Sequence, residues 1–195
     1  MARTKSENFD GIKDQILAAA AKLFADKGFR NTNIIDIGQA CNASKSRMYH
    51  YFPSKEAMLQ AMLEAHVTGL LALAGDIAQQ RMEARLKFRQ YVFVHLQYYY
   101  QFRDQHEVLI EDADHLPEGA GTAVNHAEQQ LVAYLVAILR ELNAERFKDK
   151  QVATTHAMLI YGMLNWTYTW YKPSGKFNLE NLADQASALC LNGVL

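Results

Sequence analysis

The stretch from Asn33 to Lys55 reads NIIDIGQACNASKSRMYHYFPSK, and its helix start and stop signals decide the expected fold. Apolar residues at Ile34 and Ile37 have the spacing of one helical face. Asn42 follows that helix, and asparagine tolerates a left-handed backbone, so it can form a tight turn. The pattern therefore predicts a short helix followed at once by a sharp reversal of the chain.

A second short helix is predicted after this turn. Thr32 or Asn33 can cap the first helix, and Ser44 can cap the second, because their side-chain oxygens can accept a hydrogen bond from an unpaired N–H of the first helical turn. The second helix extends to about Tyr51. Pro53 ends it, because proline disfavours helical geometry in the residue before it.

A longer helix precedes these two. From Gly11 to Lys27 the apolar residues recur at helical spacing, and Gly28 provides a C-terminal stop signal. Residues 1–8 are expected to form a flexible arm. A long helix supporting helix, short turn and helix over residues 33–51 is the pattern of a helix-turn-helix.

The rest of the chain is also predicted to be helical, so the fold class is all-α. Ser54 can cap the first of the remaining helices. The expected ranges are 55–80, 85–103, a short piece before the acidic loop EDADHLPEGAG at Glu111–Gly121, 122–143, 148–171 and 178–192, with a turn at KPSGKF.

Composition and charge restrict the class of protein further. The chain has 195 residues, half of them apolar, which is enough for a packed core. Residues 1–60 carry nine Lys/Arg against six Asp/Glu, whereas the remainder carries eleven against fifteen. A basic first third fits a nucleic-acid contact at one end. We also expect no run long enough to span a membrane and no signal peptide, and the two cysteines are far apart in sequence. Together these features predict a cytoplasmic protein.

The first third resembles the DNA-binding domain of the TetR family of transcriptional regulators over about Ile16–Leu63. The resembling pieces are ILAAAAKLFADKGF, Thr32, IIDIGQACNAS and MYHYFPSKEAML. Gly38 stands where the family usually has alanine. Helix propensity alone predicts that this glycine loosens its helix by up to ~1 kcal/mol.

This resemblance implies a set of DNA contacts around the second short helix. The expected residues are Thr32, Ser44, Lys45, Ser46, Arg47, Tyr49, His50 and Lys55. Arg47 can bond to a guanine through two hydrogen bonds, and Lys45 can reach a guanine or a phosphate. Lys55 is expected to face a phosphate at the start of the following helix.

A second set of residues is expected to bind a small effector. Tyr91, His95, Tyr98 and Phe102 fall on one helical face, which fits either a plain core or a pocket with a few polar groups in an apolar lining. The family resemblance implies that the central helices enclose the effector. The full set of predicted effector residues is Tyr91, His95, Tyr98, Phe102, Tyr134 and Trp166.

The C-terminal segment carries a narrower resemblance. GMLNWTYTWYKPSGKF, from Gly162 to Phe177, is similar to the C-terminal region of a TetR branch whose members sense acyl-CoA thioesters. It implies a small hydrophobic effector of that class. A CoA ligand needs cations for its phosphates. The spacing of the arginines and lysines after residue 55 does not indicate which of them would bind these phosphates.

These resemblances together predict a ligand-responsive transcriptional regulator that acts as a repressor. Residues 1–54 are the expected DNA-binding domain and residues 55–195 the effector-binding and dimerisation domain. The last two helices resemble the family's dimerising pair, so a homodimer on palindromic operator DNA is expected, with no cofactor.

Two other classes of function stay open at this point. A DNA-binding protein without a small effector, acting through partner proteins or DNA organisation, would carry the same helix-turn-helix. An enzyme would need a nucleophile and base, and no G-x-S-x-G or phosphate-loop signature is present. The seven histidines show no metal-ligand spacing, so no metal site is predicted.

Overall fold

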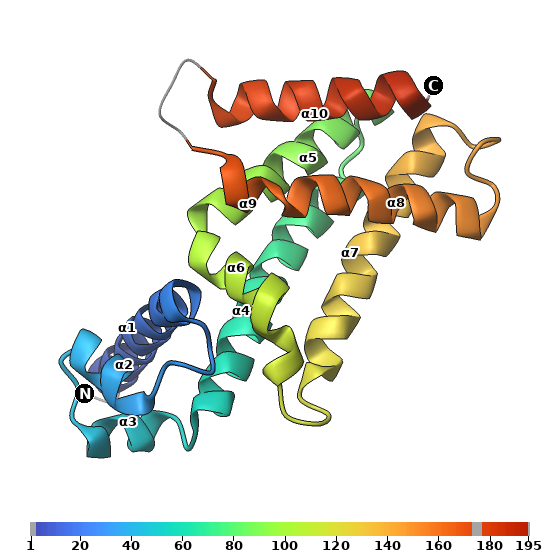
Figure 1. Ribbon diagram of the computed structural model, residues 1–195. Coiled ribbons are helices and arrows are strands. Elements are labelled where there is room, and N and C mark those ends of the chain that lie inside the picture. The colour runs from blue at the N-terminus through green and yellow to red at the C-terminus, as the bar shows by residue number, and fades with distance from the viewer. Residues whose placement is uncertain (1–2, 173–176, 195) are drawn as a thin grey trace. The chain divides into compact units, whose positions relative to one another are not determined.

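A computed structural model describes residues 3–172 and 177–194, and every regular element in that part of the chain is a helix (Figure 1). The elements are α1 (Arg3–Lys27), α2 (Ile34–Ala40), α3 (Lys45–Tyr51), α4 (Lys55–Gln79), α5 (Ala84–Gln101), α6 (Arg103–Asp112), the short 3-10 helix η1 (Ala113–His115), α7 (Gly121–Leu142), α8 (Lys150–Asn165), α9 (Thr167–Trp170) and α10 (Leu179–Val194). The predicted all-α fold is confirmed.

The chain packs as two compact units. The first contains the chain up to His66 together with Asp104–Val124, and the second contains Val67–Arg103 and the chain from Asn125 onward. The segment that includes most of α6 therefore packs in the same unit as the helix-turn-helix, although Val67–Arg103 of the second unit lies between them in sequence. A functional boundary at residues 54 and 55 remains a prediction.

The helix-turn-helix has the caps that the sequence indicates. Asn33 caps α2, with its side chain accepting from Asp36 N and the Asp36 side chain accepting from Asn33 N. Asn42 has a φ of 53°, the left-handed geometry of the predicted turn. Ser44 caps α3 by accepting from Arg47 N at 3.2 Å.

The core of the first unit holds α2 and α3 in place. Phe24 of α1, Ile37 of α2 and Met48 of α3 are all buried. Phe52, at the end of α3, is buried as well. Because one side of each short helix is buried, the opposite side of α3 is fixed toward solvent.

The second unit has its own continuous core. Helix α10 packs along α5, as Figure 1 shows, and apolar residues of α4, α5, α7, α8 and α10 meet in one cluster. An ion pair joins α5 and α7 of this unit, with the buried Lys87 Nζ 2.8 and 2.9 Å from the two carboxylate oxygens of the exposed Glu141. Arg89 of α5 also pairs with Asp184 of α10.

Three expectations from the sequence are wrong. Two concern where helices begin and end, and the third concerns a membrane-spanning run. The backbone is helical from Arg3, so the proposed flexible arm over residues 1–8 is not what the described part shows. The helix expected over 148–171 is interrupted at Trp166, where the Thr167 hydroxyl donates to Leu164 O at 2.7 Å. Part of the KPSGKF turn, including Pro173 and Gly175, lies outside the described residues.

The third correction concerns α4. By length and composition alone, Lys55–Gln79 could cross a membrane, contrary to the expectation that no such run exists. Core helices of many proteins share this composition. Here Leu59, Leu63 and Leu70 of α4 are each buried within one of the two units, so packing accounts for the apolar residues.

Gly38 does not simply loosen α2. A Cβ built at this position would lie 2.9 Å from Ala43 O and 3.3 Å from Met48 Cγ. The first of these atoms belongs to the backbone of the turn and cannot rotate away. The glycine therefore allows the α2–α3 turn to approach α2 closely, and the cost expected from helix propensity is offset by that packing.

We expect Gly38→Ala to lower the stability of the protein by about 1–3 kcal/mol, because overpacking at the turn exceeds the gain in helix propensity. The measurement is chemical denaturation followed by circular dichroism. Gly11→Ala is the matched control, because nothing lies within 4 Å of its added Cβ, and it should be neutral or stabilising. A more stable Gly38→Ala variant would contradict the packing explanation.

Candidate nucleic-acid interface

Helix α3 presents a continuous polar surface. Its exposed residues are Lys45, Ser46, Arg47, Tyr49 and His50, and Met48 is its buried anchor. The short helix thus gives cations, hydroxyl groups and an aromatic ring to solvent while a single apolar side chain fixes its orientation. Such a helix can enter the major groove, where its first turn faces base edges.

Arg47 and Lys45 are the candidates for base contacts. Both lie in the first turn of α3 and both are exposed. Ser44 already accepts a hydrogen bond from Arg47 N through its Oγ, so its first role is to cap the helix. Helix α3 thus brings together five of the predicted DNA contacts, and Ser44 caps this helix. The five are Lys45, Ser46, Arg47, Tyr49 and His50.

His50 and Tyr51 lie at the other end of α3. Their rings meet edge to face, with centroids 5.5 Å apart. His50 is exposed and Tyr51 is half-buried. The ring of Tyr51 can therefore support the orientation of His50 at the edge of the polar surface.

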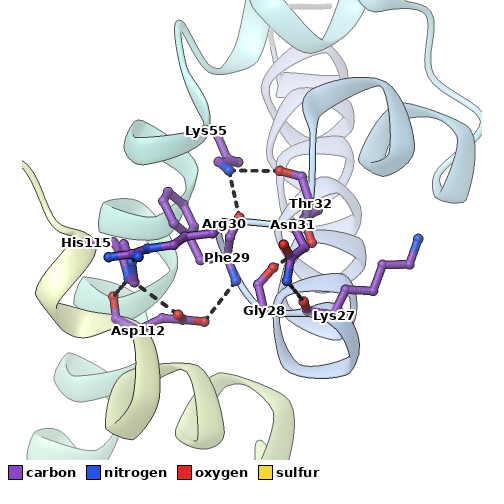
Figure 2. A network of polar contacts seen from close by, with 9 residues as sticks. All are labelled: Lys27, Gly28, Phe29, Arg30, Asn31, Thr32, Lys55, Asp112 and His115. Atoms are coloured by element: carbon purple, nitrogen blue, oxygen red, sulfur yellow. Dashed lines mark hydrogen bonds and ion pairs between the residues drawn. The ribbon is translucent and has the colours of Figure 1, made fainter.

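Thr32 and Lys55 make contacts within the protein, and their predicted phosphate contacts stay predictions. Thr32 is 2% exposed, and its hydroxyl lies 3.1 Å from Leu23 O and 3.0 Å from Gly28 O, either of which can accept its hydrogen. Lys55 Nζ donates to Phe29 O at 2.6 Å and Thr32 O at 2.8 Å (Figure 2). Both polar groups pair with backbone carbonyls of the α1–α2 turn, which gives them a structural role in the first unit.

A hollow of about 480 Å³ adjoins α3 in the first unit. Arg30, Lys45 and Tyr49 contribute to its lining, together with the first residues of α2 and α4. Arg30 was not among the predicted DNA contacts, because the turn sequence GFRN gives no sign of which way its side chain points. It brings a second cation to the surface beside Lys45.

Two of the predicted effector residues, Tyr91 and His95, form a buried polar network. Tyr91 Oη lies 2.8 Å from both Leu131 O and Tyr161 Oη, and Tyr161 Oη lies 3.2 Å from His95 Nε2. His95 Nδ1 lies 2.8 Å from Tyr91 O, so Nδ1 carries the hydrogen and Nε2 accepts. Burial lowers the pKa of His95 to about 4, which keeps the ring neutral at neutral pH.

The other four predicted effector residues are spread over the second unit. Tyr98 and Phe102 have ring centroids 4.5 Å apart, and Tyr134 packs against the core. Trp166 is 61% exposed. The structure therefore does not gather the six residues in one place, and it puts Trp166 on a surface apart from the buried Tyr91 and His95.

Two hollows lie within the second unit. One, beside Leu96 and Tyr171, has a volume of about 10 Å³, which is room for no more than a single water molecule. The other is an open groove of about 780 Å³ along α7 and α8. Its lining includes Val132, Val136 and Met158, with Arg140 and Lys150 where the two helices are joined. None of the six predicted effector residues lines this groove.

The described residues contain no group of three or more His, Cys, Asp or Glu side chains that could hold a metal ion. His66 and His106 lie in the first unit with ring centroids 5.8 Å apart, and both are buried. Burial lowers the pKa of His66 to about 4. Two of the seven histidines are therefore buried residues of that unit.

Comparison with known proteins identifies the class. Residues 16–62 match the model of bacterial regulatory proteins of the TetR family, and residues 81–194 match that of the tetracyclin repressor-like C-terminal domain. Because these matches cover most of the chain, it belongs to the TetR family of transcriptional regulators. Its relatives are regulators of transcription rather than enzymes.

Individual relatives extend along the whole chain. A TetR-family regulator from Bordetella parapertussis is 39% identical, with a TM-score of 0.88 and coverage of 93% of this chain and 94% of that one. The repressor KstR2 of Rhodococcus jostii is 25% identical over 94% of this chain and 91% of its own. AibR, whose crystal structure contains isovaleryl coenzyme A and operator DNA, shares the fold at 20% identity, with a TM-score of 0.80 over 91% of this chain and 97% of that one.

We expect Arg47→Ala to change operator preference as well as affinity. A bidentate contact to guanine contributes about 1–3 kcal/mol of discrimination, so the variant should tolerate substitution of one base pair in each half-site. The measurement is a binding titration against single-base operator variants. Lys22→Ala, on α1 and paired with Asp26, is the control and should keep the wild-type preference. If Arg47→Ala preferred the same bases as the wild type, Arg47 would be a phosphate contact.

Proposed function

We propose that this protein is a ligand-responsive transcriptional repressor that binds palindromic operator DNA as a homodimer and is released by a small hydrophobic effector. The exposed polar face of α3, anchored by Met48, carries the DNA-binding part of the proposal. The described relatives of full length include repressors, which supports the direction of regulation. A cytoplasmic location follows from that function.

Exposed apolar side chains on α8 and α10 support the homodimer. Leu159 of α8 is 68% exposed and Leu189 of α10 is 69% exposed. Val152 of α8 and Trp166, which caps the end of α8, lie seven residues on either side of Leu159, so exposed apolar side chains follow one side of this helix to its C-terminal end. A second copy of the chain could bury these residues in a four-helix arrangement, which would place two α3 helices on successive major grooves.

Leu189→Glu should yield monomers or insoluble chain and abolish operator binding, because a carboxylate buried at the interface lacks a partner. Light scattering at micromolar concentration and a band-shift experiment measure the two effects. Leu86→Glu, at an exposed leucine in the first turn of α5, is the matched control and should leave both unchanged. A dimeric Leu189→Glu variant with normal DNA binding would contradict this interface.

The effector that we propose is an acyl-CoA thioester. The resemblance of Gly162–Phe177 to acyl-CoA-responsive regulators motivates the choice, and AibR, which has the same fold, binds such a ligand in its crystal structure. The groove along α7 and α8 offers an apolar floor for an acyl chain and two cations, Arg140 and Lys150, for phosphates. Release from DNA then requires that the ligand bind the DNA-incompetent state more tightly than the DNA-bound state.

A band-shift titration with matched ligands tests this choice. An acyl-CoA should release the operator at a concentration at least about tenfold lower than its free acid or CoA alone, which corresponds to about 1.4 kcal/mol from contacts to both parts of the ligand. Short-chain, long-chain and aromatic acyl groups are compared in parallel.

The outcomes of this titration separate the possibilities. Release by the free acid at an equal or lower concentration would remove the CoA part of the proposal and leave a ligand-responsive repressor. Failure of every compound to release the DNA would favour the alternative of a DNA-binding protein without a small effector. The near absence of space beside Leu96 and Tyr171 is the observation that keeps this alternative in view.

A further inference from the structure

His115, which follows α6, binds Arg30 in the turn before the helix-turn-helix. Arg30 Nε donates a hydrogen bond to His115 Nε2 at 2.7 Å, and the two residues are 85 positions apart in sequence (Figure 2). Arg30 follows α1 in the α1–α2 turn, and His115 ends the short helix η1. Both belong to the first unit, so the contact lies within one compact body.

This bond fixes the protonation state of His115. Because Arg30 Nε can only donate, His115 Nε2 must accept and the hydrogen of a neutral ring must lie on Nδ1. His115 Nδ1 lies 3.2 Å from Asp112 O and 3.4 Å from Asp112 Oδ1. The ring therefore connects a carboxylate of α6 with a guanidinium of the turn.

The surroundings of His115 hold the ring in position. It packs on Phe29, with ring centroids 5.2 Å apart, and Asp112 Oδ2 accepts from Phe29 N at 3.1 Å. Lys55 Nζ lies over the ring of Phe29, 4.2 Å from its centroid. The charged groups facing this site are therefore Arg30 from the turn, Asp112 from α6 and Lys55 from α4.

Arg30 has donors to spare for a second partner. A guanidinium carries five N–H groups, and the bond to His115 uses the one on Nε. Arg30 is exposed and lines the hollow beside α3, together with Lys45 and Tyr49. An arginine held at its Nε by an uncharged acceptor presents the planar Nη edge that matches a phosphate.

We propose that Arg30 is a DNA-phosphate contact and that His115 is its positioning residue. A histidine outside the helix-turn-helix therefore influences the affinity of the first unit for DNA. The proposal rests on the operator binding proposed above. It adds one contact to the DNA surface and gives that contact a partner within the protein, because His115 Nε2 accepts a hydrogen bond from Arg30 Nε.

The first test measures salt dependence. The DNA is a duplex selected by the wild-type protein from a randomised library, and binding is titrated at several salt concentrations. Arg30→Ala should lower the log–log slope by about one per protomer and weaken binding to all sequences alike. Lys148→Ala, an exposed lysine in the second unit, is the matched control and should leave the slope unchanged.

The second test separates positioning from a purely structural role. His115→Ala should weaken binding in the wild-type background and add nothing to Arg30→Ala, because it acts through that residue. His115→Gln keeps a side-chain acceptor for Arg30 Nε, so it should retain more of the wild-type affinity than His115→Ala.

Each result supports or overturns one statement. An unchanged salt slope in Arg30→Ala, with Arg47→Ala still impaired, would overturn the phosphate contact and leave the proposed function intact. Additive losses in the double variant, or equal losses in His115→Ala and His115→Gln, would overturn the positioning role. If the wild type selected no duplex, the proposed function itself would fail. Thermal melting of each variant confirms that the fold is retained.

Discussion

The backbone carbonyl groups of the α1–α2 turn must accept hydrogen bonds from side chains of the first unit. The arrangement of the helix-turn-helix depends on these bonds. The chain reverses at Gly28, which has a φ of 82°, and its following carbonyls cannot join a helix. Lys55 supplies donors for Phe29 O and Thr32 O, and the Thr32 hydroxyl supplies one for Gly28 O. These bonds connect the start of α4 to the end of α1. The position of α3, which lies between α2 and α4 in the chain, is restricted from both sides.

Cations that look alike in the sequence take different roles because their surroundings differ. Lys55 is partly buried and bonds to backbone carbonyls, whereas Arg47 is exposed on α3. Arg30 stands between these cases, since it is exposed and yet held by His115. Lys55 Nζ already uses two of its three donors on Phe29 O and Thr32 O, which leaves one for a further partner. The exposed Arg47 keeps all of its side chain accessible to DNA.

The second unit uses polar groups differently. Tyr91, His95 and Tyr161 are buried and hydrogen-bonded to one another, which satisfies groups that would otherwise destabilise the core. The Tyr91 hydroxyl has one hydrogen for two acceptors, Leu131 O and Tyr161 Oη, so the network has a choice of hydrogen-bond arrangements. The open groove along α7 and α8 instead combines apolar residues with cations at one end. Binding a ligand there would leave the buried network intact.

The sequence by itself determined the local structure. Caps at Ser44 and Ser54, the left-handed residue Asn42 and the stop at Pro53 act through backbone geometry over a few residues, so the helix-turn-helix and the exposed α3 residues were predictable. Tertiary structure alone decided which polar side chains pair internally. Thr32 and Lys55 became structural, Gly38 was explained by close packing, and Trp166 was separated from Tyr91. The bond between Arg30 and His115 joins residues far apart in the chain, and spacing in a sequence carries no signal for such a contact.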